Sequence, residues 1–333
     1  MPTPYASFID PVGLVRRMVA SRDPSAWWSL VLAALRPLVA PLDRVWEAAE
    51  RDVLGAVAGE PSQPLVLVVG GSRSGTTLAY ELLVATTDVS YISNLTALFP
   101  RSPITATRRL GALARPPALT SYYGQTAGFG GTNDGFGIWD RWLGSDRYRP
   151  DRPDEATAAA MRRFFAAWTA MFPRPLVNKN NRNTLVIDGL AAALPSARFV
   201  AVRRDRRAVV RSLVRARAQI QGDVRTAWGL AAQDAGPDDL GHVDAVHRQV
   251  VEIDATLDAQ LSRVAAERVT DVAYEDVCAD PRGIVRAVAA MAGLRVDADA
   301  LARLPAMNPS PGPVLSSREE QRLTHLIGSA VEQ

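Results

Sequence analysis

The chain has 333 residues, of which 47% are apolar and 22% are charged, and its formal net charge is +3. This composition is typical of a folded protein, large enough for one α/β domain with additions, and it argues against disorder. The near balance of 38 basic and 35 acidic residues gives no reason to expect a nucleic-acid partner, and one cysteine with three histidines predicts neither disulfides nor a metal site.

Residues 1–60 are expected to form a helical extension of the main domain. The segment begins without the pattern of a signal peptide, so a cytoplasmic protein is expected. The apolar run from Pro24 to Leu35 is shorter than the ~20 residues that span a bilayer, and Arg36 and Pro37 interrupt it. Its tryptophans and leucines predict helices that pack on the main domain, on a second copy in a homodimer, or on a membrane surface, and these alternatives stay open.

A phosphate-binding loop is predicted after the apolar run Leu65–Val69, which has the length of a buried parallel strand. Gly70, Gly71 and Gly75 allow backbone angles that other residues avoid, so that loop amides can point at one anion. A helix that begins near Ser74 adds unpaired N–H groups and the positive end of its dipole. Strand, loop and helix together predict a site for phosphate.

The loop matches the pattern G-x-x-x-x-G-K-[ST] only in part. Gly70, Gly75 and Thr77 fit, but Thr76 stands where the lysine would be. Arg73 lies inside the loop instead. The sequence therefore predicts a phosphate loop whose positive charge comes from a different position.

Residues 78–150 contain a helix predicted at Leu78–Ala85, a short strand at Val89–Ile92, and then a long stretch rich in glycine, proline and aromatic residues. A stretch of this length inside a compact domain is usually a lid or a substrate-binding insertion. We expect an acceptor-binding insertion at about residues 100–150. Asp134 and Asp140 lie in its glycine-rich part.

Lys179 is the one lysine among the 38 basic residues. It directly follows a predicted strand at Leu176–Asn178, which comes after an amphipathic helix at Asp154–Phe172 and before a helix at Thr184–Leu194. Ligands of parallel sheets collect at the carboxyl ends of the strands. Lys179 is therefore a candidate active-site cation, at a place where a compact ammonium group is needed.

A second anion site is predicted after the strand Arg198–Val202. Arg203 and Arg204 follow that strand directly, and Ser212 lies eight residues after Arg204 on the next helix. One arginine fork and one hydroxyl that face the same pocket suit a phosphate group.

The rest of the chain predicts a helix at about Leu240–Ala266, a strand at Val269–Val272, a helix after Pro281 and a tail helix after Ser317. His242 and His247 are expected to be exposed on the first of these helices. The simplest fold is α/β, a three-layer arrangement of a parallel sheet between helices, in which residues 61–333 form the main domain.

The loop Gly71–Thr77, followed by Arg204 and Ser212 in a strand–turn–helix, resembles the bacterial type of sulfotransferases that use 3′-phosphoadenosine 5′-phosphosulfate (PAPS). The loop is most similar to that of tyrosylprotein sulfotransferases. The segment Tyr274–Pro281 also resembles a Tyr-Glu-Asp-Leu…Asp-Pro segment of the family. Two phosphate sites in the right order make the resemblance specific, and it covers about residues 65–295.

The resemblance implies roles for individual residues. The 5′-phosphosulfate would be held by the loop, and the 3′-phosphate by Arg204 and Ser212. Lys179 and Arg73 would neutralise charge while a sulfuryl group moves to a hydroxyl of a carbohydrate, glycolipid or natural product, with no metal required. The loop residues concerned are Gly71, Ser72, Arg73, Ser74, Gly75, Thr76 and Thr77.

The sequence departs from the family at the general base. Cytosolic sulfotransferases have a histidine where this chain has Asn181, and tyrosylprotein sulfotransferases have a glutamate where it has Ser93 and Asn94. The carboxylates left as candidates are Asp134 and Asp140.

Two other functions stay open at this point. A kinase-like phosphotransferase would share the loop but would need the lysine that Thr76 replaces. A noncatalytic nucleotide-binding relative would explain the missing base.

Overall fold

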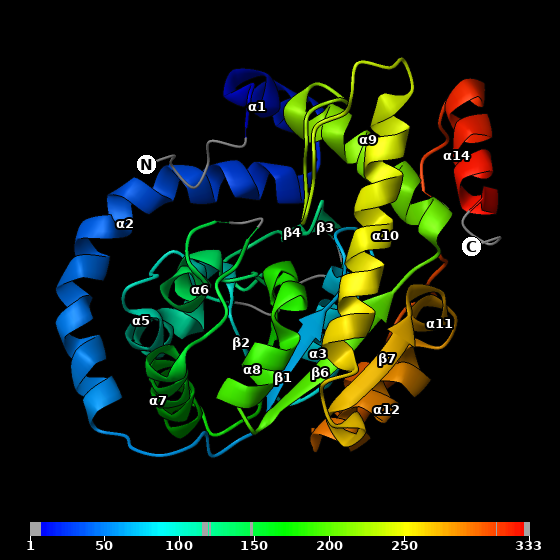
Figure 1. The fold of residues 1–333 in the computed structure, drawn as a ribbon. Coiled ribbons are helices and arrows are strands. Elements are labelled where there is room, and N and C mark those ends of the chain that lie inside the picture. The colour runs from blue at the N-terminus through cyan, green and yellow to red at the C-terminus, as the bar shows by residue number, and fades with distance from the viewer. Residues whose placement is uncertain (1–7, 115–118, 120, 147–148, 311, 330–333) are drawn as a thin grey trace.

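Five parallel strands form the central sheet, in the order β2–β5–β1–β6–β7 (Figure 1). The computed structural model describes residues 8–114, 119, 121–146, 149–310 and 312–329, so parts of the predicted N-terminal extension, insertion and C-terminal tail lie outside it. β1 pairs with β5 on one side and with β6 on the other, which puts the phosphate loop in the middle of the sheet. The strands are β1 (Leu65–Val69), β2 (Ser90–Tyr91), β5 (Leu176–Lys179), β6 (Ala197–Arg203) and β7 (Val269–Ala273).

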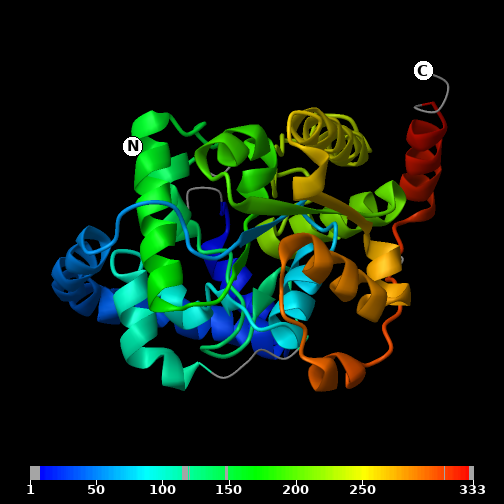
Figure 2. The same ribbon diagram turned by 90° about the horizontal axis from the view of Figure 1, so that it is seen from below.

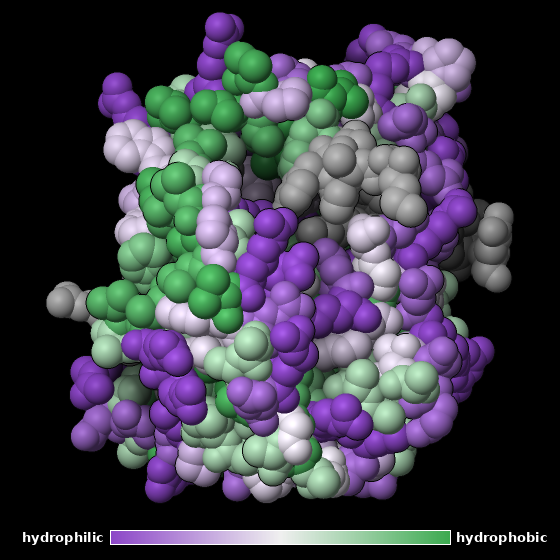
Figure 3. Space-filling model, turned by 90° about the vertical axis from the view of Figure 1, so that its left-hand side faces the viewer, coloured by the Kyte–Doolittle hydropathy of each residue, from purple (hydrophilic) through white to green (hydrophobic). Residues whose placement is uncertain are grey.

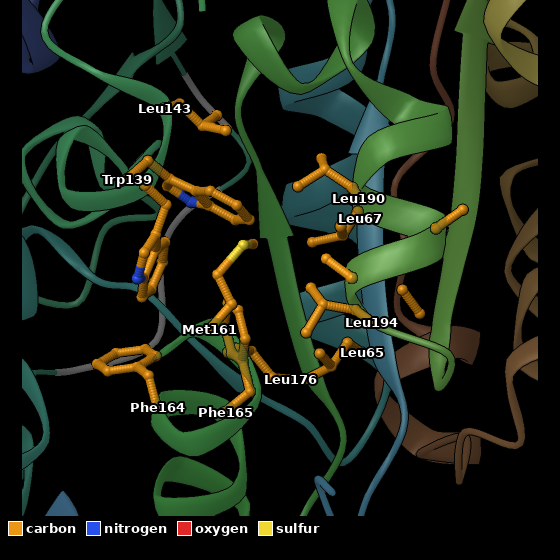
Figure 4. Close-up of a cluster of buried hydrophobic side chains, with 14 of the residues drawn as sticks. Leu65, Leu67, Trp139, Leu143, Met161, Phe164, Phe165, Leu176, Leu190 and Leu194 are labelled. Carbon is orange, nitrogen blue, oxygen red and sulfur yellow. The ribbon is translucent and has the colours of Figure 1, made fainter. Parts of the chain in front are cut away.

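Alternate residues of β1 point into two apolar cores, one on each face of the sheet. Leu65, Leu67 and Val69 pack against helices α6 (Phe136–Leu143), α7 (Glu155–Met171), α8 (Ile187–Ala193) and α10 (Gly241–Leu261) (Figure 4). Val66 and Val68 pack against α3 (Thr76–Thr86), α12 (Pro281–Ala292) and α13 (Ala298–Ala302). Helices thus cover both faces (Figure 2), and the predicted three-layer α/β fold is confirmed.

The predicted helix at Thr184–Leu194 is divided into a 3₁₀ turn, η2 (Asn181–Leu185), and α8. The other main strands and helices predicted after residue 150 are present within a few residues of their expected bounds. Further elements are α9 (Arg206–Gln221), α11 (Tyr274–Ala279) and α14 (Ser317–Ser329) after β6, with α4 (Asn94–Ala97), α5 (Pro103–Leu110), β3 (Ser121–Tyr122) and β4 (Gln125–Thr126) before α6.

The expected exposure of His242 and His247 is wrong, because both side chains are buried. α14 packs on α10, and Nε2 of His242 lies 2.6 Å from Oε1 of Glu319 on α14. The polar sequence of α10 gives no sign of this tail helix, which supplies a carboxylate for the polar side chain that it covers.

Two N-terminal helices, α1 (Pro11–Ala20) and α2 (Pro24–Gly55), precede the sheet, and α2 curves around one side of the molecule (Figure 1). Arg36 and Pro37 interrupt the apolar run Pro24–Leu35 but not the helix, since α2 continues through Pro37 and Pro41. Each proline removes one hydrogen bond, to the carbonyl of Ala33 or of Pro37. Both of these residues are exposed, so water can bind the carbonyls and the helix can bend there.

α2 is held to the body by two buried carboxylates that cap α5. Asp43 accepts hydrogen bonds from Ser102 N and Oγ at 3.0 and 2.7 Å. Glu50 accepts from the amides of Ile104 and Thr105 at 3.1 and 2.8 Å. These amides belong to the N-terminal turn of α5, where negative charge is stabilised. The middle of α2 therefore has a fixed position against the main domain.

Within the described part of the chain, α2 is the one helix whose length and composition would allow it to cross a bilayer. Only 17% of its most apolar 18-residue stretch is buried inside the protein.

Candidate active site

The phosphate loop that connects β1 to α3 has the backbone that its glycines predict. Gly70 and Gly75 adopt φ angles of 145° and 97°. A Cβ atom at Gly75 would lie 2.4 Å from Cδ2 of Tyr274, so a larger residue would collide with that ring. Arg73 is also left-handed, at φ 71°, a conformation that is uncommon and costly for a residue other than glycine.

The N-terminus of α3 is open for an anion. No side chain caps it, and Ser74 Oγ instead donates to the carbonyl of Gly71 at 2.9 Å, which closes the turn of the loop. The first-turn amides of a helix have no partner within the helix, and its dipole favours negative charge at this end. The hydroxyl groups of Thr76 and Thr77 lie on this turn.

The second predicted anion site, between β6 and α9, lies directly beside the loop. Arg73 Nε donates to Ser212 Oγ at 2.9 Å, and Arg204 Nη1 donates to the carbonyl of Arg73 at 3.0 Å. The Arg204 guanidinium lies 4.3 Å above the ring of Tyr274. Residues that are far apart in the sequence thus form one cationic group.

Arg73 and Arg204 form no ion pair with any carboxylate among the described residues. Burial lowers the pKa of Arg73, and repulsion from Arg204 adds to this effect. Nε of Arg204 is buried without a hydrogen-bond partner in the described chain. Two neighbouring guanidinium groups that lack a carboxylate partner suit a bound phosphate. The phosphate would supply the missing negative charge and the missing hydrogen-bond acceptors.

Lys179 lies at the carboxyl end of β5 and is buried, as its position after the strand predicts. Its Nζ lies 2.8 and 2.9 Å from the two carboxylate oxygens of Asp134. A Cβ atom at Gly124 would lie 3.4 Å from Thr77 Oγ1 and 3.7 Å from Lys179 Nζ, so both side chains lie close to this glycine. Asp140, the other candidate base, lies 2.9 Å from Nη2 of Arg182.

These residues surround one cavity of about 1290 Å³. Gly71 and Ser74, which were also predicted for the site, do not line it. All the other residues predicted for the site do, namely Ser72, Arg73, Gly75, Thr76, Thr77, Asp134, Asp140, Lys179, Arg204 and Ser212.

The wall of the cavity away from the phosphate loop is largely apolar and comes from the N-terminal helices and the insertion. α1 and α2 contribute Leu14, Met18, Leu30 and Leu32. The insertion adds Leu98, Leu119, Tyr123 and Phe136. The cavity therefore has a cationic end at the loop, whereas its wall beside α2 combines these apolar side chains with Arg36, Asp43 and Arg44.

Four further residues of the cavity, Glu81, Tyr123, Trp228 and Tyr274, were not among the predicted site residues. Tyr123 lies over the Arg73 guanidinium at 4.9 Å and packs edge-on against Trp228 at 6.3 Å, and Tyr274 contacts Arg204 and the loop. Glu81 lines the cavity from α3, four residues after Thr77. A single acid in the apolar helix Thr76–Thr86 was the available signal for Glu81. Trp228 and Tyr123 come from irregular segments in which the sequence gives no periodicity.

Residues 64–298 match the model of the sulfotransferase family. Among solved structures, the chain is similar to sulfotransferase STF9 from Mycobacterium avium, with a TM-score of 0.55 and 17% identity over 87% of this chain and 80% of that one. It is also similar to sulfotransferase STF1 from Mycobacterium tuberculosis H37Rv, with a TM-score of 0.55 and 14% identity over 94% and 91%. No curated protein sequence matches. At these identities the structures support the fold, while the family match covers the whole central sheet and both predicted anion sites. The chain belongs to the sulfotransferase family.

Proposed function

We propose that the protein transfers a sulfuryl group from PAPS to a hydroxyl group of an acceptor. The observation that carries this proposal is the joined cationic group of Arg73, Ser212 and Arg204 beside the uncapped N-terminus of α3. A donor with phosphate groups at both its 5′ and 3′ positions needs two adjacent anion sites, and this arrangement supplies them.

In this proposal the loop amides with Thr76 and Thr77 hold the phosphosulfate, and Arg204 with Ser212 selects the 3′-phosphate. PAPS, when bound, supplies a sulfuryl group attached to a good leaving group. Lys179, buried at the end of β5, neutralises negative charge that develops on the leaving phosphate. Because Lys179 and Arg73 supply positive charge, the proposal requires no metal ion.

The acceptor is proposed to be an amphiphile, such as a glycolipid or a hydrophobic natural product. Its hydroxyl would lie at the cationic end of the cavity and its apolar part against Leu14, Leu30 and Leu32. Apolar walls with a few polar groups at one end are typical of sites that bind such molecules. A free sugar would leave the apolar wall without a partner.

We also propose that α1 and α2 lie on a lipid bilayer. All but two of the exposed large apolar side chains in the described residues lie between Ile9 and Val45, the exceptions being Leu113 and Val314. Trp27, Val31, Leu38, Leu42 and Val45 recur along α2 at helical spacing. Figure 3 looks onto the side formed by α2 and shows apolar side chains gathered along this face.

Charge on these helices supports a bilayer rather than a second copy. Asp43 and Glu50 are buried in the caps of α5. The exposed arginines of α1, α2 and their connection, Arg16, Arg22, Arg36, Arg44 and Arg51, therefore outnumber the exposed acids. An apolar face bordered by exposed arginines suits anionic headgroups, whereas two such faces would repel each other. An amphiphilic acceptor could then enter the cavity from the bilayer.

Nucleotide binding separates this function from the two alternatives. Calorimetry on the full chain is expected to show that the protein binds adenosine 3′,5′-bisphosphate, the product nucleotide, with higher affinity than ATP. Preference for ATP would favour a phosphotransferase. Binding of the bisphosphate without sulfation of any lipid or natural product would favour a noncatalytic relative, so mass spectrometry should compare lipid extracts of cells that express the wild type with those that express Lys179→Ala.

A further inference from the structure

Glu81 is a buried carboxyl group with no role in the fold that its contacts explain. It lies in α3, is 2% exposed and lines the cavity. Its Oε1 is buried and has no hydrogen-bond partner among the described residues. Burying a carboxyl group without partners costs free energy, and native proteins usually avoid this cost except where the group functions.

The position of Glu81 is fixed relative to the reacting groups. It lies four residues after Thr77, so both side chains are on the same face of α3, one turn apart. The Thr77 hydroxyl and the Lys179 ammonium group both lie near Gly124, and Lys179 is close enough to attract the Glu81 carboxylate. A hydroxyl group that approaches the sulfuryl group near Thr77 and Lys179 therefore comes within reach of Glu81.

The other candidate bases, and the residues that stand where family members have their base, make contacts within the protein. Both carboxylate oxygens of Asp134 accept hydrogen bonds from Lys179 Nζ, and Asp140 forms an ion pair with Arg182. Ser93 Oγ accepts from the amide of Thr96 at the start of α4. Asn94 donates to the carbonyls of Thr126 and Gly128, and Asn181 accepts from Thr76.

We propose that Glu81 is the general base of the transfer, an inference that rests on the proposed function. The carboxylate takes the proton of the acceptor hydroxyl while the acceptor oxygen forms a bond to sulfur. The bond between sulfur and the bridging oxygen of the phosphosulfate breaks, and its electron pair leaves with the phosphate. A general base contributes about 10²–10⁴-fold in rate.

The electrostatic surroundings agree with this role. Burial raises the pKa of Glu81 to about 8, against a smaller lowering by Lys179 of β5. Asp134, which faces Lys179 from the loop before α6, is paired with that lysine. Of the charged groups on the other elements packed against α3, Arg282 and Arg286 of α12 line a separate pocket, and Asp299 of α13 is exposed. A base is most effective when its pKa lies near the working pH.

The first test measures binding of adenosine 3′,5′-bisphosphate by calorimetry from pH 6.5 to 9.5. Because an ionised Glu81 repels the nucleotide, the affinity of the wild type is expected to fall about tenfold as the pH rises through 8. Glu81→Gln should bind with an affinity that depends less on pH, and the matched control Asp299→Asn should behave as the wild type. If the wild type does not bind the nucleotide at all, the proposed function fails, independently of Glu81.

The second test compares two acceptors with PAPS as donor, 1-dodecanol and p-nitrophenol. The phenol is largely ionised near neutral pH and needs no base, whereas the alcohol keeps its proton. Glu81→Gln is therefore expected to lower the rate with dodecanol by at least about 100-fold and the rate with p-nitrophenol by less than about threefold.

An equal loss with both acceptors would assign Glu81 a structural role and overturn the proposal, as would full activity of Glu81→Gln with dodecanol. A wild-type protein that binds the nucleotide but neither sulfates one of these acceptors nor hydrolyses PAPS would also overturn the proposal.

Discussion

Arg73 of the phosphate loop donates from Nε to Ser212 Oγ on α9 at 2.9 Å, so the two predicted anion sites share a hydrogen bond. The loop follows the central strand β1, and α9 follows its neighbour β6. Parallel pairing of these strands brings their carboxyl ends to the same edge of the sheet, although 139 residues separate the two side chains. A substitution at one anion site is therefore expected to change anion binding at the other.

Nucleotide binding tests this arrangement. Arg204→Ala is expected to weaken binding of adenosine 3′,5′-bisphosphate by about 100-fold or more, and Ser212→Ala by about tenfold, because each removes a charge-assisted hydrogen bond to phosphate. Calorimetry gives both numbers. Arg203→Ala is the matched control, since Arg203 pairs with Asp258 and Asp271 outside the cavity. Equal affinity of Arg204→Ala and Arg203→Ala would contradict the assignment of the 3′-phosphate site.

Lys179 is expected to tolerate no substitution, including arginine. Lys179→Ala should lower the rate of sulfuryl transfer by about 100-fold or more through lost charge stabilisation. Lys179→Arg should restore little of it, because a planar guanidinium cannot occupy the buried place of an ammonium group held by Asp134. Single-turnover rates with p-nitrophenol measure this loss apart from any effect on nucleotide affinity, and near-normal transfer by Lys179→Arg would argue against a compact point charge.

The stability of the protein should depend on the ionisation of Glu81. Its pKa is about 8 in the fold and near 4.5 in the unfolded chain, so the folded state binds the extra proton between these values. The stability conferred by the neutral form is present below pH 4.5 and is lost as the pH rises towards 8. Relative to the wild type, Glu81→Gln should therefore gain stability with rising pH, by about 2–4 kcal/mol at pH 8.5. Urea unfolding at pH 6 and pH 8.5 measures the difference, and a pH-independent difference would refute the raised pKa.

The carboxylate cap that α2 places on α5 should contribute measurably to stability. Glu50→Ala leaves two buried amides and the Thr105 hydroxyl without their acceptor and is expected to cost about 2–3 kcal/mol in the free energy of unfolding. Glu50→Gln, which keeps one acceptor oxygen, should cost less. Chemical denaturation ranks the three proteins, and an alanine variant as stable as the wild type would mean that α2 is not anchored in this way.

The apolar face of α2 should bind anionic membranes. Co-sedimentation of the full chain with vesicles of phosphatidylcholine and phosphatidylglycerol is expected to exceed that with phosphatidylcholine alone. The double variant Leu38→Glu/Val45→Glu should lose this binding, because both side chains are at least 70% exposed on α2.

Leu113→Glu is the matched control for this experiment, since Leu113 is also a large apolar residue, is 60% exposed and lies outside α1 and α2. The face would be assigned to a second copy instead if the wild-type protein does not bind vesicles and sediments as a dimer, and if the double variant does not form this dimer.

Strand ends and phosphate-loop residues were predictable because they depend on local patterns. Leu65–Val69 and Arg198–Val202 read as buried strands, and parallel strands bring the residues after their carboxyl ends to one edge of the sheet. That is why Lys179, Arg204 and Ser212 were found from sequence and do line one cavity. Their assigned functions remain predictions.

Glu81 was not found in this way, because its significance depends on Lys179, which approaches it only through tertiary packing. The burial of His242 depends in the same way on α14. The continuity of α2 was not predicted because proline usually ends a helix. Here the carbonyl groups that the prolines leave unpaired face water, and under that condition proline ends a helix less reliably.

The two ends of the cavity come from different parts of the chain. The donor end is built from the sheet and the turns after β1 and β6, whereas much of the acceptor wall comes from α1 and α2, which join the body through their own caps and contacts. Under the proposed function, mutations in residues 8–55 are therefore expected to alter which molecules are sulfated while nucleotide affinity stays the same. This separation would let related enzymes diverge in acceptor by exchanging their N-terminal helices, and it makes those helices the first segment to graft when a new acceptor is wanted.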